Sequence, residues 1–195
     1  MVKAMTWNGL EAGFMLDRQW YWLRGEMERT KRPAILALAR VFAEAQVPYA
    51  IIGGVAFQVH HTEPRTTLDI AVAVTAYAQL SRVPLEAAGF TRTGQFSHSE
   101  NWLGPDRILV QFTDDPALAE AIRHAEQIEL EDVHLRVIGR ADLLHEKLRA
   151  ASNPVQRRSK RLQDLVDAQA LLESTPTLAQ ELHAEERALL DQLPR

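Results

Sequence analysis

The sequence predicts an α/β (α+β) protein in which helices flank a mixed, partly antiparallel sheet and the C-terminal half is helical. Three observations lead to this prediction. Short apolar runs of strand length alternate with segments of helical periodicity up to about residue 140. A glycine pair, Gly53 and Gly54, separates one such run from a helical segment. Beyond residue 140 the helical patterns follow one another without a strand-like run.

The N-terminal region is rich in tryptophan. Three of the four tryptophans lie in the first 22 residues, and Trp7, Leu10, Phe14 and Tyr21 follow helical spacing. One interpretation is an aromatic-faced helix that packs on the protein's own core. The alternative is a contact with a second copy, giving a homodimer, or with a partner protein, because aromatic residues are enriched at interface cores.

The next elements lead into the glycine pair. Pro33 begins a helix, since proline is favoured in the first helical turn. A buried strand follows at residues 47–52, and Gly53 and Gly54 allow the backbone to turn tightly into another helix. We therefore expect a strand–turn–helix unit at this point.

The rest of the chain continues the alternation. A second apolar strand at residues 68–74 precedes a helix at 76–88, which Pro84 should break or kink. Residues 91–103 predict one or two exposed strands. The remaining predicted elements are strands at 107–113, 128–130 and 134–138, and helices at 116–126, 141–151, 159–172 and 177–193. We expect three regions: an aromatic helical segment (1–32), an α/β core (33–140) and a helical region (141–195).

Composition excludes several classes of protein. The chain has 195 residues, a net charge of −4 and no cysteine. That charge argues against wholesale coating of nucleic acid. Without cysteine there are no disulfides or thiolate metal sites, which fits a cytoplasmic protein. No apolar run approaches about 20 residues, so no membrane span is expected, and the N-terminus lacks a signal-peptide pattern.

The clearest functional pattern follows the glycine pair. Arg65, Thr67 and Asp69 form an R-x-T-x-D arrangement, and Ala71 stands two residues after the aspartate. This ordered set, between two apolar strands, resembles the nucleotidyltransferase superfamily. The resemblance is to the AbiEii-like and minimal nucleotidyltransferases of bacterial toxin–antitoxin and phage-resistance systems. It extends over residues 47–172 and implies a nucleotidyltransferase-like fold.

The metal site that the resemblance implies is degenerate in this chain. The family pattern ends in D-x-D, which places two carboxylates on one face of a strand to hold Mg²⁺ against nucleotide phosphates. Ala71 occupies the second position, and Gln111 stands where a later strand supplies a third acid. Asp69 is the one metal ligand left of the three. The resemblance therefore implies weak Mg²⁺ binding, with a nucleoside triphosphate (NTP) as substrate or ligand.

The resemblance also implies roles in the C-terminal half. Lys147 matches a helical lysine that contacts nucleotide phosphate, and Asp164 matches an aspartate that orients this lysine. Together with Asp69 they form the implied catalytic set. The alternative is a surface lysine, and a helix-start acid paired with nearby arginines.

The implied nucleotide-binding set is Gly53, Gly54, Arg65, Thr67 and Lys147. Backbone N–H groups of the glycines would approach phosphate at a helix N-terminus, and Arg65 would hold phosphate through two hydrogen bonds. The need for a tight turn explains the glycines equally well. A loop arginine also commonly caps a carbonyl group or pairs with an acid such as Asp69.

A basic window and the histidines complete the candidates. Residues 147–161 contain six basic and no acidic side chains. Arg157, Arg158, Lys160 and Arg161 in this window suit contact with RNA phosphates, or form a solvated helix end. The seven histidines show no recognisable metal-binding spacing.

Two main functions remain open. The first is a weak or inactive nucleotidyltransferase that binds nucleotide, RNA or a cognate toxin or antitoxin protein, which Ala71 and Gln111 favour. The second is an active metal-dependent enzyme that transfers a nucleotidyl group from an NTP to RNA or protein, which Asp69, Lys147 and Asp164 favour. A purely structural α/β module would require the R-x-T-x-D match to be chance.

Overall fold

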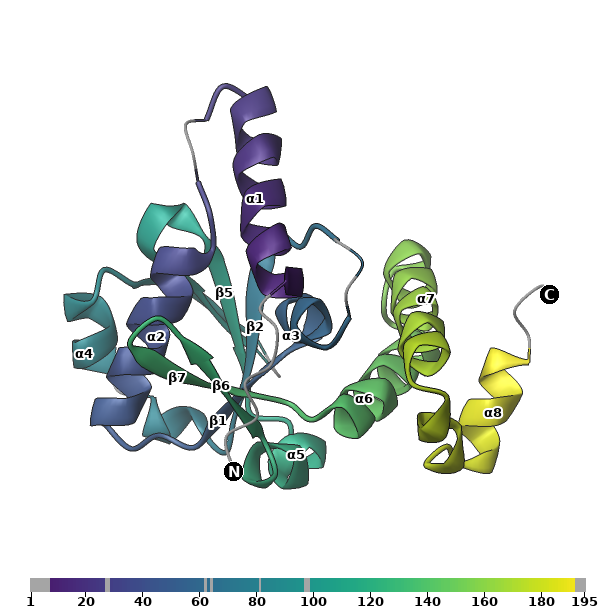
Figure 1. Cartoon of the computed structure of the whole chain (residues 1–195). Helices are drawn as coiled ribbons and strands as arrows, with labels where there is room; N and C mark the ends of the chain where they lie inside the picture. Colours follow the sequence, from purple (N-terminus) through teal and green to yellow (C-terminus); the bar gives the residue numbers. More distant parts are fainter. Residues whose placement is uncertain are drawn as a thin grey trace. The chain divides into compact units, whose positions relative to one another are not determined.

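A computed structural model describes residues 8–26, 29–61, 63, 65–80, 82–96 and 99–191. The chain divides into two compact units, Met1–Ile138 and Gly139–Arg195. The first unit holds the sheet and the second is helical (Figure 1). The fold class is therefore the mixed α/β class that the sequence predicts.

Seven strands within the described residues form one mixed sheet in the order β3-β4-β5-β2-β1-β7-β6. In this sheet β2 pairs in parallel with β5, and β1 pairs in parallel with β7. The other neighbouring pairs, β1–β2, β3–β4, β4–β5 and β6–β7, are antiparallel. The strands are β1 (Tyr49–Ile52), β2 (Asp69–Val74), β3 (Thr91–Phe96), β4 (Ser99–Leu103), β5 (Leu109–Thr113), β6 (Glu126–Leu130) and β7 (Val133–Val137).

Five helices and three short 3₁₀ turns, η1 to η3, accompany the sheet in the described part of this unit. Figure 1 shows α2 lying beside α4. It also shows the N-terminal end of α1 packing on α3. The second half of α1 extends away from the sheet. The helices are α1 (Asn8–Leu23), α2 (Arg32–Glu44), α3 (Gly53–His60), α4 (Arg82–Ala87) and α5 (Ala119–Arg123), and the 3₁₀ turns are η1 (Tyr77–Gln79), η2 (Pro105–Arg107) and η3 (Pro116–Leu118).

The aromatic segment divides into a buried and an exposed part. Leu10 and Phe14 are each 2% exposed, which agrees with docking on the protein's own core. Trp20 and Trp22 are 42% and 70% exposed on the part of α1 that extends away. Trp7 lies outside the described residues.

Proline placement corrects one predicted helix. The single helix expected at residues 76–88 is wrong, because η1 and α4 replace it. Pro84 is the third residue of α4, within the first turn, where its missing N–H has no intrahelical partner to lose. The helix expected at 116–126 is also too long, since α5 ends at Arg123 and Glu126 begins β6.

The hairpin of β3 and β4 is exposed on one strand only. All six residues of β3 are at least partly accessible, and its pairing with β4 shifts register between Arg92 and Gly94. On β4, Glu100 and Trp102 are fully buried, so the expectation of exposure is wrong for this strand. The Glu100 carboxylate is compensated by Arg92 and by the Trp102 indole N–H, at 3.2 and 3.0 Å.

The second unit consists of α6 (Arg140–Ser152), α7 (Arg158–Ser174), the 3₁₀ turn η4 (Pro176–Gln180) and α8 (Ala184–Leu190). Its core includes Leu143, Leu144, Leu148, Ala168 and Leu171, which come from α6 and α7. Among the helices of the described residues, none is both long enough and apolar enough to cross a bilayer.

Candidate functional site

Strands β2 and β5 bring three of the predicted site positions together. Ala71 pairs with Gln111 in the parallel register, and Asp69 lies two residues before Ala71 on β2. Side chains alternate between the two faces of a strand, so Asp69, Ala71 and Gln111 share one face. All three are partly accessible, whereas Ile70 and Val110, which point to the other face, are buried.

Strand β4 adds a fourth polar position that sequence reasoning missed. Asn101 pairs directly with Gln111 in the antiparallel register, so its side chain lies on the same face. The Asn101 side-chain oxygen is buried and has no hydrogen-bond partner among the residues that the structure describes. Ala71, Gln111 and Asn101 thus form a row across three strands that offers a methyl group and two neutral amides.

The glycine pair lies beside this row. Gly53 has φ +64°, a left-handed conformation that favours glycine, and a Cβ there would be 3.3 Å from the Ala71 Cβ. A Cβ on Gly54 would approach the Thr67 hydroxyl oxygen to 2.5 Å, which is a clash. Both glycines therefore have a structural reason in the close packing of α3 against the loop and strand that carry Thr67 and Ala71.

A buried ion pair that the sequence did not indicate supports the site. The Lys31 ammonium donates to the Asp17 carboxylate of α1 and to the Thr67 carbonyl oxygen, the latter at 2.7 Å. The Lys31 and Asp17 side chains are 1% and 3% exposed. Thr67 in turn donates from its hydroxyl to Asp69 at 3.1 Å. Lys31 is therefore linked to Asp69 through Thr67.

Burial controls the electrostatics of this ion pair. Burial lowers the pKa of Lys31, and the charges of Asp17 and Asp69 offset part of that change. Burial likewise raises the pKa of Asp17, and Lys31 opposes the rise. Lys31 lies close enough to Asp69 for its positive charge to act on that carboxylate.

Arg65 is positioned by an aromatic ring. Its guanidinium carbon lies 5.3 Å from the centroid of the Phe57 ring on α3, within the range of a cation–π contact. The Arg65 carbonyl accepts a hydrogen bond from the Gln58 side chain, so the loop is also held through its backbone.

The second unit places Lys147 and Asp164 in contact. The Lys147 ammonium is 2.8 Å from Asp164 and 3.0 Å from Asp167, and all three side chains are at most 2% exposed. The alternative of a surface lysine is therefore wrong. Burial alone would lower the pKa of Lys147, but the neighbouring carboxylates, Glu146 foremost, outweigh burial and raise it.

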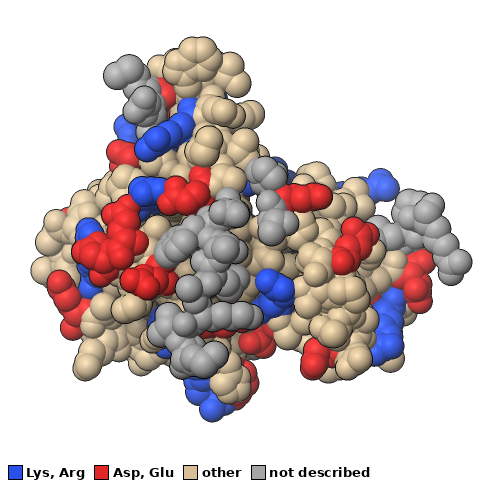
Figure 2. Space-filling model, viewed as in Figure 1, with Lys and Arg blue, Asp and Glu red and all other residues tan. Residues whose placement is uncertain are grey.

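The basic window surrounds the first turn of α7. Arg157 and Arg158 are exposed. Lys160 pairs with Asp164 at 2.7 Å, and the Arg161 side chain donates to the Ala151 carbonyl oxygen at 2.8 Å. Figure 2, which shows one face of the molecule, has basic and acidic side chains intermixed.

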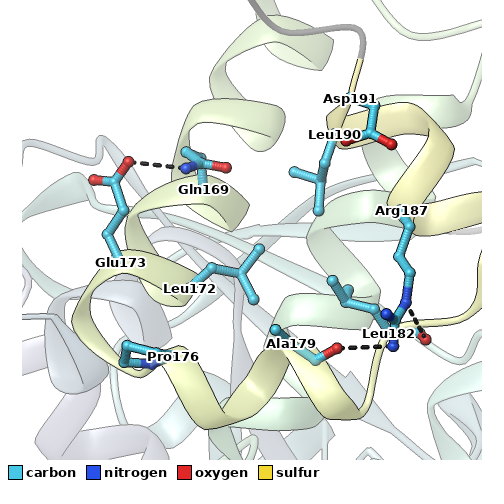
Figure 3. A pocket seen from close by; sticks show the side chains of 9 residues that line it. All are labelled: Gln169, Leu172, Glu173, Pro176, Ala179, Leu182, Arg187, Leu190 and Asp191. Atoms are coloured by element: carbon cyan, nitrogen blue, oxygen red, sulfur yellow. Dashed lines mark hydrogen bonds between the residues drawn. The ribbon is translucent and has the colours of Figure 1, made fainter. Parts of the chain in front are cut away.

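A pocket of about 570 Å³ lies in the second unit, between α7, η4 and α8 (Figure 3). Leu172, Leu182 and Leu190 give it an apolar lining, while Arg187 donates to the Ala179 carbonyl oxygen at 3.0 Å. None of the residues that line this pocket belongs to the predicted site.

Comparisons with known proteins agree with this fold. The family model described as "Nucleotidyl transferase AbiEii toxin, Type IV TA system" matches residues 79–193. The match begins after the segment that carries Gly53 and Asp69. None of the curated proteins matches the sequence.

Solved structures with a similar fold are nucleotidyltransferases or resemble them. The structure of ANT(2″)-Ia in complex with adenylyl-2″-tobramycin has a TM-score of 0.54 at 16% identity, covering 83% of this chain and 98% of that chain. The lincomycin-bound lincosamide antibiotic adenylyltransferase LnuA has a TM-score of 0.51 at 14% identity, covering 73% and 98%. An antigenic nucleotidyltransferase-like protein from Paracoccidioides brasiliensis has a TM-score of 0.51 at 19% identity, covering 72% and 74%.

At these identities the solved structures show a common fold and nothing more specific. The family model spans more than half of the 195 residues. This protein therefore belongs to the AbiEii nucleotidyltransferase toxin family.

Proposed function

We propose that this protein is a weak or inactive nucleotidyltransferase that binds a nucleoside triphosphate through its phosphates without depending on Mg²⁺. The observation that supports this most strongly is the pairing of Ala71 with Gln111 beside Asp69. Of the three positions where the family pattern has acids, one holds a carboxylate. The geometry thus favours binding over catalysis.

The donor set does not fit a magnesium centre. Mg²⁺ is a hard cation that is held through carboxylates, substrate phosphates and water. Asp69 brings one negative charge to this face, and Gln111 and Asn101 bring none. The Asp69 carboxylate also already accepts a hydrogen bond from the Thr67 hydroxyl. Phosphoryl-type transfer depends on cancelling developing negative charge, usually with metal ions, so robust transfer is not expected.

The start of α3 and the neighbouring Arg65 suit the binding of an anion. Ile52, the residue before α3, provides no side-chain acceptor for the backbone N–H groups of the first turn. Such groups attract phosphate, and Arg65, in the loop before β2, adds a positive charge, whereas the buried Lys31 ammonium is already engaged by Asp17. We do not extend this binding role to Lys147, because its ammonium is already engaged by two carboxylates.

Calorimetric titration with ATP and GTP tests the binding. We expect similar affinities with Mg²⁺ and with EDTA in the wild-type protein. Arg65→Ala should weaken binding by about tenfold or more, since a hydrogen bond to a charged group contributes about 1.5–3 kcal/mol. Arg24→Ala, which removes an exposed arginine after α1, is the matched control and should bind like the wild type. Binding that vanishes in EDTA would contradict the proposal.

A double substitution tests whether Ala71 and Gln111 are the vacated metal positions. Ala71→Asp with Gln111→Asp would place three carboxylates on one face, and the glycine at position 53 leaves room beside residue 71. Without metal their repulsion should lower the melting temperature. Mg²⁺ or Mn²⁺ at about 100 times its Kd should then stabilise the variant by about 2.7 kcal/mol.

The matched control for added charge is Thr91→Asp with Thr93→Asp. It adds two carboxylates, likewise without their own cation, on the exposed strand β3, which β4 and β5 separate from Asp69 on β2. We expect no specific response to metal from this control, and little from the wild type. Equal metal responses in all three proteins would show that residues 71 and 111 are not the vacated positions.

The active-enzyme alternative is tested on the wild type alone. Incubation with labelled NTPs, Mg²⁺ and a pool of bacterial RNA or protein acceptors should give no transfer above the level of an Asp69→Asn variant. Robust transfer that this variant abolishes would replace our proposal with the active enzyme.

Because the matched family model describes a toxin of a type IV toxin–antitoxin system, a cognate antitoxin is the partner protein that we propose.

A further inference from the structure

Two histidines and a glutamate from distant parts of the sequence meet in the second unit. His145 lies on α6, His183 immediately precedes α8, and Glu186 lies in the first turn of α8. One ligand atom from each residue lies within 4.8 Å of the others. Neither histidine was singled out by the sequence, because 38 residues separate them and neither forms a short metal-binding motif.

Hydrogen bonds join the three residues, and one of them is accepted by the His183 side chain from the Glu186 backbone N–H. The His145 Nδ1 atom is 2.8 Å from Glu186 Oε1. The second oxygen of the glutamate, Oε2, accepts a hydrogen bond from the His183 backbone N–H at 2.8 Å. The two imidazole rings are nearly parallel, at 19°, with centroids 5.1 Å apart. The carboxylate thus connects both histidines.

Their chemistry is that of a transition-metal ligand set. Two imidazole nitrogens and one carboxylate oxygen suit Zn²⁺ and other borderline cations, whereas Mg²⁺ prefers oxygen ligands alone. Zinc bonds of about 2.0–2.1 Å place tetrahedral ligand atoms about 3.4 Å apart. The ligand atoms lie within 4.8 Å of one another, so zinc would draw them closer together, and all three side chains are at least partly accessible.

We propose that His145, His183 and Glu186 bind one Zn²⁺ ion, or a similar transition-metal ion, with water as the fourth ligand. The site lies entirely within residues 139–195 and does not depend on the proposed nucleotide function. The ion would join α8 to α6. The described α8 has seven residues, and a helix this short gains its stability from contacts rather than from its own propensity. Metal binding should therefore raise the stability of the C-terminal unit.

The alternative is a hydrogen-bonded histidine–glutamate pair without metal. The test uses the full chain without an affinity tag, stripped of metal. We expect calorimetry to give one Zn²⁺ per chain and Co²⁺ to produce the visible absorption of tetrahedral coordination. Mg²⁺ should do neither. The melting temperature should rise with Zn²⁺ as mass action requires.

Three variants identify the ligands. The variants His145→Ala, His183→Ala and Glu186→Gln should each weaken zinc binding by at least about tenfold. Even the loss of a residue that only supports a metal ligand typically lowers metal affinity by about 10–100-fold. Glu186→Gln keeps an oxygen that accepts the His183 N–H, so its fold should be preserved. His134→Ala, an exposed histidine on β7, is the matched control and should bind zinc like the wild type.

Two results would overturn the proposal. One is a wild-type protein that binds less than one zinc ion per chain at about 100 μM free Zn²⁺, a concentration at which a specific three-ligand site should be filled. The other is zinc binding that survives His183→Ala, with unchanged cobalt absorption, since the ligands would then lie elsewhere. Loss of nucleotide binding would have no effect on either measurement.

Discussion

Replacing Lys31 with methionine should destabilise the first unit strongly. The substitution keeps much of the side-chain volume but leaves the Asp17 carboxylate, 3% exposed, without its partner. Removing one member of a buried ion pair costs about 3–5 kcal/mol. Since a domain of this kind is stable by about 5–15 kcal/mol, the variant should lose about a fifth of its stability or more.

Substituting Asp17, the other member of the ion pair, should cause a different loss of stability. Asp17→Asn leaves Lys31 with the Thr67 carbonyl oxygen and with the nearby charge of Asp69, so it should cost less than Lys31→Met. The double variant Asp17→Leu with Lys31→Met removes both buried charges. Replacing a whole buried pair with apolar groups is often neutral or stabilising. We therefore expect it to be more stable than either single variant.

The directions of the two pKa shifts predict how the loss of stability in Lys31→Met depends on pH. Burial raises the pKa of Asp17 and lowers that of Lys31, so burial of the pair disfavours both charges. Stability tied to a raised carboxyl pKa is present at low pH and is lost as pH rises through the folded-state pKa. Without Lys31 the Asp17 pKa should rise further. The difference in free energy of unfolding between the wild type and Lys31→Met should therefore become smaller as the pH falls and the Asp17 carboxyl group takes up a proton.

Urea unfolding, followed by fluorescence and circular dichroism from acidic to neutral pH, measures these differences. Arg40→Met is the control, because it breaks an ion pair with Asp132 in which the side chains are 49% and 69% exposed. Its loss should be about 1 kcal/mol or less. A Lys31→Met variant within 1 kcal/mol of the wild type, or a double variant as unstable as that single variant, would refute the assignment of a buried ion pair.

Three further predictions follow from the same kind of reasoning. In the second unit, Lys147→Met leaves two buried carboxylates without this partner and should cost about 3–5 kcal/mol by thermal unfolding. The exposed-pair control Arg40→Met should cost about 1 kcal/mol or less, and equal losses in the two variants would contradict the prediction. Gly54→Ala should lower the melting temperature, because its Cβ would lie 2.5 Å from a threonine oxygen; an unchanged melting temperature would argue against this packing. Trp20→Ser with Trp22→Ser should leave unfolding nearly unchanged but abolish any self-association seen by sedimentation. A dimer that survives would rule out these two exposed tryptophans as its interface.

Local patterns in the sequence were sufficient for the centre of the fold. The apolar runs around the glycine pair predicted β1, α3 and β2, because tight turns and buried strands have local signatures. The single helix expected at residues 76–88 was wrong because Pro84 does not break or kink one helix but lies in the first turn of a new one. Proline in the middle of a periodic segment fits a new helix starting there as well as a kinked one.

The site was predictable only where a motif carried it. Asp69, Ala71 and Gln111 could be grouped by alternation along the strand and by resemblance. Lys31 and Asp17 stand 14 residues apart, in a loop and on a helix, and no local pattern marks such a pair. Asn101 joins the row only through the strand register, which depends on long-range pairing rather than on the sequence near it.

The irregular pairing of β3 affects the tendency of the protein to aggregate through the edge of its sheet. This strand ends the sheet, and an edge strand presents unpaired N–H and C=O groups to which another chain can add. The register shift between Arg92 and Gly94 interrupts that regular row and increases its twist. Arg92 also keeps a charge at this edge, fixed to a buried glutamate. The shift thus acts as a barrier to fibre-like growth from one copy to the next, and straightening it by deleting Thr93 should make the protein prone to aggregation.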